Sequence, residues 1–326
     1  MEILVLGAAG MVGRKLIERL LREGRLRGQA ISAIHGFDVV EGSFDYSGPI
    51  ELTMSAGDVS DSATVDALVD SRPDIVFHLA AIVSGEAESD FHKGYRVNLV
   101  GTQNLFNAIE MRADYHPRVV YASSIAVFGA PFPESIDDEF HLTPLTSYGT
   151  QKAIGELLLA DHTRKGNFDG IGMRLPTIVV RPGKPNLAAS GFFSNIIREP
   201  LSGLPAQLPV STDVMHWMAS PRSAVGFCIR AAEIDGDEVG PRRNLTMPGL
   251  AITVGEMLAA LGRVAGQKAE SLVEHKEDGT ISGIVANWPR KFSAKRAESL
   301  GFSAEKTFED IIQAHIDDEL GGQLPG

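Results

Sequence analysis

Glu2-Ile-Leu-Val-Leu6, followed by Gly7-Ala-Ala-Gly10-Met-Val-Gly13, is the stretch that decides the fold of this chain. The apolar run is short and ends in glycine, which is typical of a strand buried on both faces in a parallel sheet. From Met11 to Glu23 the apolar residues recur at helical spacing, and Gly24 supplies a C-terminal stop. A strand, a glycine-rich turn and a helix in this order predict the opening unit of a dinucleotide-binding fold.

Each glycine of the turn has its own expected task. Gly7 permits the tight turn, Gly10 lets a phosphate approach the backbone, and Gly13 lets the helix pack closely on the strand. The free N–H groups and positive end of the helix suit a pyrophosphate. A glycine-rich turn without a ligand is the alternative, but the strand–helix context favours the cofactor.

Strands and helices alternate as far as about residue 180, which predicts an α/β fold: a Rossmann doubly wound parallel sheet with helices on both faces. Beyond that point the rhythm breaks, and Pro and Gly become frequent between Pro182 and Pro205. We therefore expect a dinucleotide-binding domain over 1–180 and a smaller C-terminal α/β substrate lobe over 181–326, interleaved with the first and not folding independently. The further expected strands are Ala30–Ile34, Ile50–Met54, Asp74–His78, Arg118–Ala122 and Gly170–Leu175, and the further helices Ser62–Asp70, Ser89–Arg112 and Thr146–Lys165.

Composition excludes several classes of protein. The 326 residues carry a formal net charge of −12, which argues against nucleic acid as a partner. A single cysteine, Cys228, excludes an internal disulfide and a cysteine-based metal cluster, and its apolar neighbours predict a buried thiol. No run of about twenty apolar residues and no signal peptide is visible. We expect a cytoplasmic enzyme without a metal or a membrane partner.

Acidic residues after the second and third strands are candidates for contacts with the adenosine. Asp38 lies 25 residues past Gly13, where a carboxylate would bind both ribose hydroxyls and repel a 2′-phosphate. No arginine adjoins it in the sequence, so NAD is favoured over NADP; Asp45 is a weaker rival. Asp58 and Val59 would frame the adenine, although Asp58 also suits a helix cap.

Tyr148-Gly-Thr-Gln-Lys152 carries the chemistry. Tyr and Lys at i and i+4 share one face of a helix, so the ammonium is expected to lower the pKa of the phenol. A phenol tuned in this way can take a proton from an alcohol near neutral pH. An ordinary exposed helix turn is the alternative; the upstream Ser123-Ser124 and the glycine motif favour catalysis.

Taken together, these motifs resemble the extended short-chain dehydrogenase/reductase family over nearly the whole chain. Each motif is weak alone, but their shared order is specific. They are Gly7-x-x-Gly10-x-x-Gly13, Asp58-Val59, His78-Leu-Ala-Ala81, Asn98, Ser123-Ser124 with Phe128-Gly129, and Tyr148-x-x-x-Lys152.

The resemblance implies a role for each matching residue. Tyr148 would be the general base, Lys152 its partner and a ligand of the nicotinamide ribose, and Ser124 the hydroxyl that steadies the reacting oxygen, with Ser123 the alternative. Asn98 would support the active site. The remaining contacts with NAD would come from Met11 and Val12 at the pyrophosphate, from Leu79, Ala80, Ala81 and Val83 along the adenosine and ribose channel, and from Pro176 and Ile178 at the nicotinamide.

Longer segments are similar to a group within this family that oxidises the C2 hydroxyl of a four-carbon sugar acid with NAD. These segments are Val83–Glu88, Thr143–Glu156, Arg174–Gly183, Ile197–Pro200 and Ser220–Arg222. The resemblance implies a small sugar acid as substrate and, from the family's habit of pairing through two helices, a homodimer.

A sugar acid needs a partner for its carboxylate, and a bidentate guanidinium has the best geometry. Arg222 is our candidate, although a surface arginine is an equal alternative; Arg174 and Arg181 flank a sheet strand and are less favoured. Ser84 and Gly85 would add polar contacts to the same acid. Thr177 and Asn186 are further candidates for polar residues that line the substrate pocket, whereas His216 and Trp217 suit the core better.

Other functions compete with this interpretation. A nucleotide-sugar epimerase of the same superfamily stays open, whereas a dehydratase is disfavoured because Ile125 and Ala126 stand where dehydratases carry acidic residues. A non-catalytic dinucleotide sensor is disfavoured because such proteins typically lose the tyrosine–lysine pair.

Overall fold

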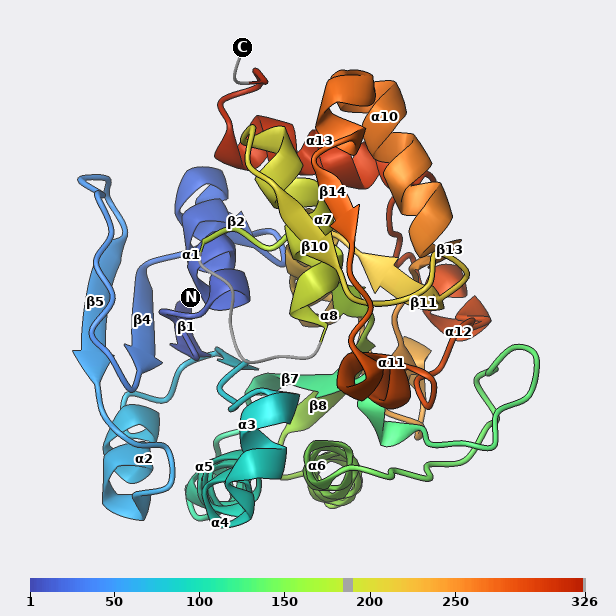
Figure 1. The fold of residues 1–326 in the computed structure, drawn as a ribbon. Helices are drawn as coiled ribbons and strands as arrows, with labels where there is room; N and C mark the ends of the chain where they lie inside the picture. Colours follow the sequence, from blue (N-terminus) through green and yellow to red (C-terminus); the bar gives the residue numbers. More distant parts are fainter. Residues whose placement is uncertain (184–189, 325–326) are drawn as a thin grey trace.

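A computed structural model describes residues 1–183 and 190–324; Asn186 lies outside these ranges. A seven-stranded sheet in the order β12-β8-β7-β6-β1-β4-β5 forms its centre, and every neighbouring pair is parallel (Figure 1). This topology confirms the expected Rossmann fold. Its strands are β1 (Glu2–Leu6), β4 (Ala33–Asp38), β5 (Glu51–Ala56), β6 (Ile75–His78), β7 (Arg118–Ser124), β8 (Asp169–Leu175) and β12 (Asn244–Thr246).

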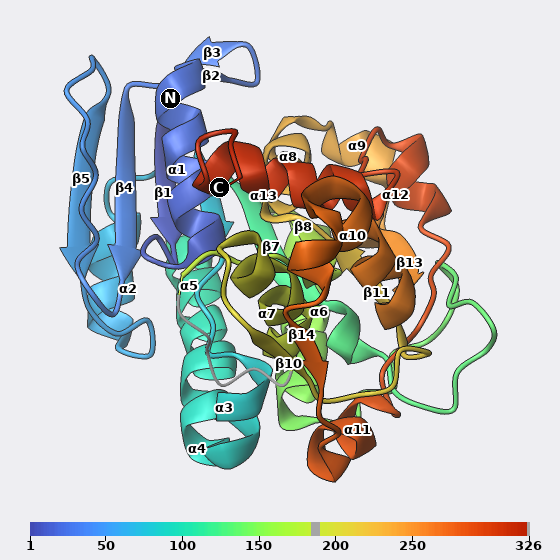
Figure 2. The same ribbon diagram turned by 45° about the horizontal axis from the view of Figure 1, so that its top comes forward.

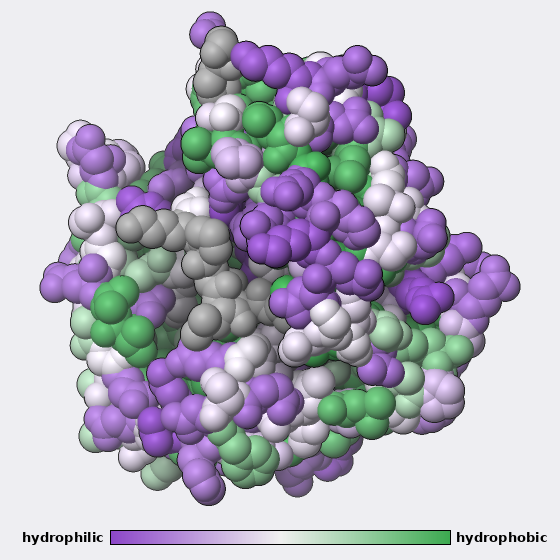
Figure 3. Space-filling model, viewed as in Figure 1, coloured by the Kyte–Doolittle hydropathy of each residue, from purple (hydrophilic) through white to green (hydrophobic). Residues whose placement is uncertain are grey.

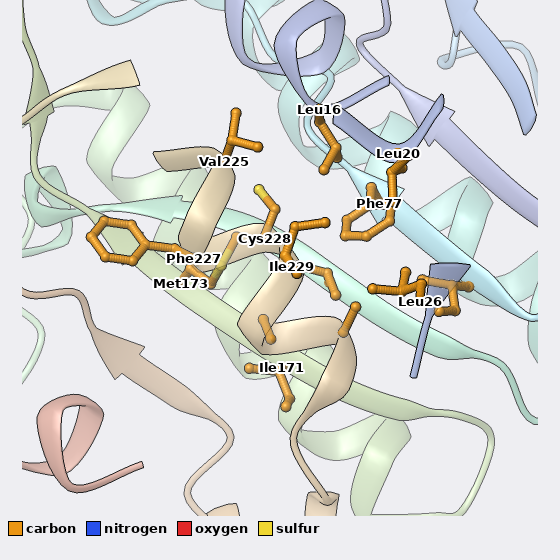
Figure 4. Packing of buried hydrophobic residues seen from close by; sticks show 14 of the residues in the cluster. Leu16, Leu20, Leu26, Phe77, Ile171, Met173, Val225, Phe227, Cys228 and Ile229 are labelled. Atoms are coloured by element: carbon orange, nitrogen blue, oxygen red, sulfur yellow. The ribbon is translucent and has the colours of Figure 1, made fainter. Parts of the chain in front are cut away.

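Helices cover both faces of this sheet (Figures 1 and 2). One face packs against α2 (Ser62–Val69), α5 (Gly101–Glu110) and α6 (Ser147–Arg164), and the other against α1 (Met11–Glu23) and α8 (Pro221–Glu233). Between the sheet and α8, the side chains of Phe227 and Cys228 lie among those of Ile171 and Met173 (Figure 4). Cys228 is buried as expected, and burial raises the pKa of its thiol to about 12.

A second core lies over the carboxyl edge of the sheet. It is built on a three-stranded sheet in the order β13-β11-β9 and on the parallel pair β10-β14. The strands are β9 (Thr177–Ile178), β10 (Ala206–Leu208), β11 (Met215–Ala219), β13 (Leu250–Thr253) and β14 (Val273–His275), and the helices α7 (Gly191–Leu201), α10 (Val254–Glu270), α11 (Gly279–Val285) and α13 (Phe308–Glu319).

The remaining elements are short. They are the hairpin β2 (Arg25–Leu26) and β3 (Gln29–Ala30), the helices α3 (Ser84–Ser89), α4 (Phe91–Gly94), α9 (Gly236–Val239) and α12 (Lys295–Ser299), the π-helix η1 (Tyr95–Val100) and the 3₁₀ turn η2 (Ile125–Val127).

The second half of the sequence also contributes to the first sheet. β12 pairs with β8, and α8 covers one face of the sheet, although both follow residue 180. The division at residue 180 stays a prediction; at these two elements the halves share one core.

Two of the expected elements were misplaced. The strand expected at Ala30–Ile34 is β4, three residues later, because the chain first turns back in the β2–β3 hairpin, where Arg27 and Gly28 have positive φ. The helix expected at Ser89–Arg112 begins at Phe91, as α4, η1 and α5 in succession, because the non-helical backbone of Asp90 (φ −125°, ψ 84°) ends α3. The Asp90 carboxylate caps α4 by accepting a hydrogen bond from Lys93 N.

Hydrophilic side chains cover much of the face shown in Figure 3. Over residues 1–183 and 190–324, we find no helix whose length and apolar character would let it cross a bilayer.

Candidate active site

The turn between β1 and α1 is held by close backbone packing. Gly7 has a φ of +87°, and a Cβ there would lie 2.7 Å from the backbone nitrogen of Ala80. At Gly13, a Cβ would lie 2.1 Å from the Gly7 carbonyl oxygen. Side chains are therefore excluded at both positions, and Leu79 and Ala80, just past β6, lie directly against the turn.

Gly10 caps the N-terminus of α1, and Met11 and Val12 form its first turn. No side chain caps this helix end, so its N–H groups are available to an anion. The geometry is the one that a pyrophosphate requires.

Asp38 ends β4 beside the same turn. Its carboxylate accepts hydrogen bonds from the backbone nitrogens of Ala9 (2.9 Å) and Val39 (2.7 Å). These bonds tie the carboxylate to the glycine turn, where the sequence predicts a ribose contact. The rival Asp45 is exposed in the following loop.

Asp58 and Val59 have local partners. The Asp58 carboxylate accepts bonds from Ser60 N and Oγ, whereas Asp61 provides the cap of α2 that was considered for Asp58. Val59 is 4% exposed, and its carbonyl oxygen accepts a bond from Asn104 Nδ2. Both residues thus shape the turn after β5.

Asn98 lies in the π-helix η1, a local widening that often marks a functional site. It is 1% exposed, which excludes a solvent-facing amide. Its Oδ1 accepts from Ile82 N (2.9 Å), and its Nδ2 donates to the side-chain oxygen of Gln151 (2.8 Å). Asn98 therefore joins the loop after β6 to helix α6.

The residues after Ile82 start a helix. Val83 is the cap and Ser84 the first residue of α3. Ala81, between this cap and β6, is partly buried. Glu88 of α3 accepts bonds from Ser147 N and Oγ at the start of α6, so the two helices are joined at the site.

Tyr148, Lys152 and Ser124 meet where α6 crosses the carboxyl end of β7. Lys152 is 2% exposed, and its Nζ donates to the Ala122 carbonyl oxygen (2.7 Å) and lies 5.8 Å from the centroid of the Tyr148 ring. Ser124 lies close enough to Tyr148 for its side chain to lower the pKa of the phenol. Ser124 Oγ also accepts from Ala126 N (3.1 Å), the first turn of η2.

The pKa values correct one expectation. Burial raises the pKa of Tyr148 to about 12, partly offset by the Ser124 side chain, so Lys152 does not lower it in the protein alone. Desolvation also lowers the pKa of Lys152 to about 7, against the attraction of Glu156. Because the ammonium is itself costly to charge, it gives the phenolate less support than the spacing suggested.

A buried ionic network under these residues was not predicted. Glu156, 1% exposed, accepts bonds from Ser123 Oγ (2.5 Å) and from the guanidinium of Arg174 (2.8 Å to Nη2). The Ser123 hydroxyl is thus bonded to Glu156 of α6, so Ser124 is the serine whose hydroxyl can contact a substrate. The i, i+4, i+8 spacing of Tyr148, Lys152 and Glu156 is the signal that could have found this carboxylate.

Pro176, Thr177 and Ile178 continue from β8 at the same edge, since Ser124 pairs in register with Leu175. Thr177 Oγ1 lies 2.6 Å from His216 Nε2, and Ile178 packs on the core. His216 therefore belongs to the core, as expected, yet it contacts a candidate substrate residue.

Arg222 does not serve as the free cation that the sequence suggested. Its guanidinium binds Asp318 (2.7 Å) and Asp317 (3.3 Å) of α13 on the surface, and these bonds raise its pKa. Arg181, four residues past Thr177, is partly buried, and desolvation lowers the pKa of its guanidinium. It donates to the hydroxyls of Ser190 (2.9 Å) and Ser194 (3.5 Å), and no carboxylate of the described residues lies within 4 Å of it.

The residues present fit NAD. The glycine turn excludes side chains, so a pyrophosphate can approach its backbone, and Asp38 ends the second parallel strand. The buried Lys152 donates one N–H to the protein and keeps its other N–H groups for ribose hydroxyls. A cavity of about 570 Å³ lies elsewhere, lined by residues that include Phe132, Met215 and Arg290.

Comparison with known proteins agrees with this geometry. A model of the NAD dependent epimerase/dehydratase family matches residues 3–218. D-erythronate dehydrogenase of Cupriavidus necator is 43% identical over 324 residues, which cover 98% of each chain. The D-erythronate dehydrogenase of Haemophilus influenzae is 36% identical over 322 residues, 98% of this chain and all (100%) of that one.

A solved structure is also similar over the full length. The crystal structure described as the nucleoside-diphosphate-sugar epimerase from Agrobacterium tumefaciens has a TM-score of 0.97 and 58% identity, and covers 100% of this chain and 96% of that one. The names of these relatives thus divide between oxidation of a sugar acid and epimerisation of a nucleotide sugar.

Proposed function

The chain belongs to the NAD dependent epimerase/dehydratase family, and we propose that it is an NAD-dependent dehydrogenase that oxidises the C2 hydroxyl of D-erythronate to 2-dehydro-D-erythronate. The observation that carries the chemistry is the meeting of Tyr148, Ser124 and Lys152 at the carboxyl edge of the sheet. Two curated relatives at 43% and 36% identity over nearly the whole chain, both D-erythronate dehydrogenases, support the substrate.

Tyr148 takes the proton of the substrate hydroxyl while the hydrogen on the same carbon leaves as hydride. Bound NAD supplies the hydride acceptor and a positive charge that favours the phenolate. Ser124 donates to the substrate oxygen as negative charge develops there. Lys152 holds the ribose and, while charged, lowers the cost of the phenolate.

Arg181 is our replacement for Arg222 as the partner of the substrate carboxylate. It follows Thr177 by four residues, is partly buried, and has only hydroxyl partners for its guanidinium among the described side chains. A partly buried guanidinium without a carboxylate favours an incoming anion. The positive charge of Arg198, which lowers the pKa of Arg181, is already paired with Glu199.

The epimerase alternative is less favoured. The two curated relatives at 43% and 36% identity are named dehydrogenases, whereas the epimerase name belongs to one similar structure and to curated relatives of lower identity, such as a UDP-glucose 4-epimerase at 25%. The two activities differ in a measurable way, because a dehydrogenase releases NADH and an epimerase returns the hydride to its substrate.

The experiment mixes the purified protein with NAD and either D-erythronate or UDP-sugars, and follows absorbance of NADH. We expect net NADH with D-erythronate alone. Interconversion of UDP-sugars without net NADH would replace the proposed function by the epimerase.

We also propose a homodimer formed through α5 and α6. Val100 and Met111, at the two ends of α5, are 40% and 81% exposed, and Leu157 on α6 is 65% exposed. Such apolar side chains on neighbouring helices favour burial against a second copy. Sedimentation of the protein and of a Leu157→Asp variant tests this: a dimer that becomes a monomer is expected, and a monomeric wild type would exclude it.

A further inference from the structure

His216 is held by four partners, in a way that fixes where its proton lies. The side chain is 2% exposed and stacks on Phe193 (5.4 Å between centroids, 5° between planes), with Trp288 5.2 Å away on a tilted plane. Its Nδ1 lies 2.9 Å from the carbonyl oxygen of Pro289, and its Nε2 lies 2.6 Å from Thr177 Oγ1.

A carbonyl oxygen only accepts, so Nδ1 must carry the proton that bonds Pro289. A neutral imidazole has one N–H, which leaves Nε2 as an acceptor. Burial keeps this ring neutral by lowering the pKa of His216 to about 4. The Thr177 hydroxyl must therefore donate its hydrogen to Nε2.

This assignment decides what Thr177 can recognise. With its proton committed to His216, the hydroxyl oxygen keeps only lone pairs for other partners. Thr177 is partly exposed, two residues past Leu175, which pairs in register with Ser124. An acceptor at this place attracts a hydroxyl and disfavours a carboxylate or phosphate, which also only accept.

We propose that His216 is a positioning residue that makes Thr177 a hydrogen-bond acceptor for a hydroxyl on the substrate carbon chain beyond the reacting C2. This inference rests on the proposed dehydrogenase and narrows its substrate class to hydroxy acids with a further hydroxyl. The carboxylate is bound elsewhere in the site.

The kinetic test compares substrates as well as variants. Let the selectivity be kcat/KM for D-erythronate divided by kcat/KM for its 3-deoxy or its 4-deoxy analogue. In Thr177→Val the selectivity against one analogue should fall about 10- to 100-fold, whereas Thr177→Ser should keep most of it. Equal selectivity in Thr177→Val and the wild type, against both analogues, would overturn the proposal.

His216→Phe keeps the stacking and removes both nitrogens. This variant should lower the same selectivity. The double variant Thr177→Val/His216→Phe should lose no more selectivity than Thr177→Val alone, because both substitutions remove the same hydrogen bond. Fully additive losses would mean that His216 affects only packing, which contradicts the proposal.

A second measurement does not depend on turnover or on a variant that folds. Nitrogen NMR of the ¹⁵N-histidine-labelled protein reports which ring nitrogen carries the proton. We expect Nδ1–H and a bare Nε2 for His216 between pH 5 and 8; an Nε2–H signal would overturn the assignment. If no hydroxy acid is oxidised, the proposed function fails, while this signal still decides whether Thr177 is an acceptor.

Discussion

Two groups of residues lie at the same edge of the sheet but are assembled in opposite ways. One is the α6 face, formed by Tyr148 and Lys152, and the other is the Thr177–His216 wall, formed by that hydrogen-bonded pair. On α6, Tyr148 and Lys152 are four residues apart, and one helix turn brings them together. In the wall, Thr177 and His216 are 39 residues apart, and His216 meets Pro289 across another 73. The groups for proton transfer thus come from one local motif, whereas the groups for substrate choice come from the tertiary fold.

The largest expected effect lies on the α6 face. Tyr148→Phe removes the proton acceptor but keeps the ring, so kcat should fall about 10³- to 10⁴-fold. NAD titration by fluorescence serves as the control and should show nearly unchanged affinity. A variant with more than a tenth of wild-type kcat would remove Tyr148 from the mechanism.

The second prediction concerns the free energy of unfolding that is lost by burying the charged side chain of Lys152. The pKa of Lys152 is lowered from 10.5 to about 7 in the folded protein, so the unfolded chain holds more protons between these values. Wild-type stability should therefore rise with pH from about 7 toward 10.5. Below pH 7 the charged form opposes folding by at most about 5 kcal/mol, because each pKa unit corresponds to about 1.4 kcal/mol.

Lys152→Met should accordingly be inactive yet more stable at pH 6, with a gain that shrinks at pH 9.5. Urea unfolding at both values measures it, and Lys165→Met, at the exposed end of the same helix, is the matched control. A stability difference that is the same at both pH values would show that Lys152 is not desolvated.

The third prediction contrasts Arg181, four residues past Thr177, with Arg222, which lies on the surface beside α13. Arg181→Met should lower kcat/KM for the sugar acid about 100-fold, mostly through KM, because a charge-assisted bond to the carboxylate is lost. Arg222→Met should change it less than about twofold, since Arg222 binds carboxylates of α13. The reverse order would restore the sequence-based assignment.

The smallest expected effect is at Asp38, where the sequence predicts a contact with the adenosine ribose of NAD. Asp38→Asn can keep the bond from Ala9 N, loses the acceptor for Val39 N, and removes the charge that repels a 2′-phosphate. Affinity for NAD should fall about tenfold and the preference over NADP should shrink, as measured by equilibrium binding of both. Unchanged discrimination would assign the preference to other residues of the turn.

The contrast between the two regions also explains what the sequence could reveal. The glycine turn, the parallel strands and the Tyr148–Lys152 pair follow from spacing along one element, and they were predictable. The role of Arg222 was not, because its partners Asp317 and Asp318 are about 95 residues away. The tautomer of His216 depends on a carbonyl that only the folded chain brings near.

Burial was the second quantity that spacing could not provide. The i, i+4 pattern places Lys152 beside Tyr148, but it does not say that Lys152 is buried and Tyr148 partly buried. Desolvation then moves the two pKa values in opposite directions, against the simple attraction between charges.

The late strand β12 and the helix α8 have a consequence for how the protein is made. On the ribosome, the first six strands of the central sheet emerge before the chain that completes it. Until α8 is translated, the apolar side chains that meet Phe227 and Cys228 stay exposed to water, and until residue 246 is translated, β8 lacks its neighbour β12. We therefore expect the nascent chain to need chaperone protection until that point, and to settle into its native form only near the end of synthesis.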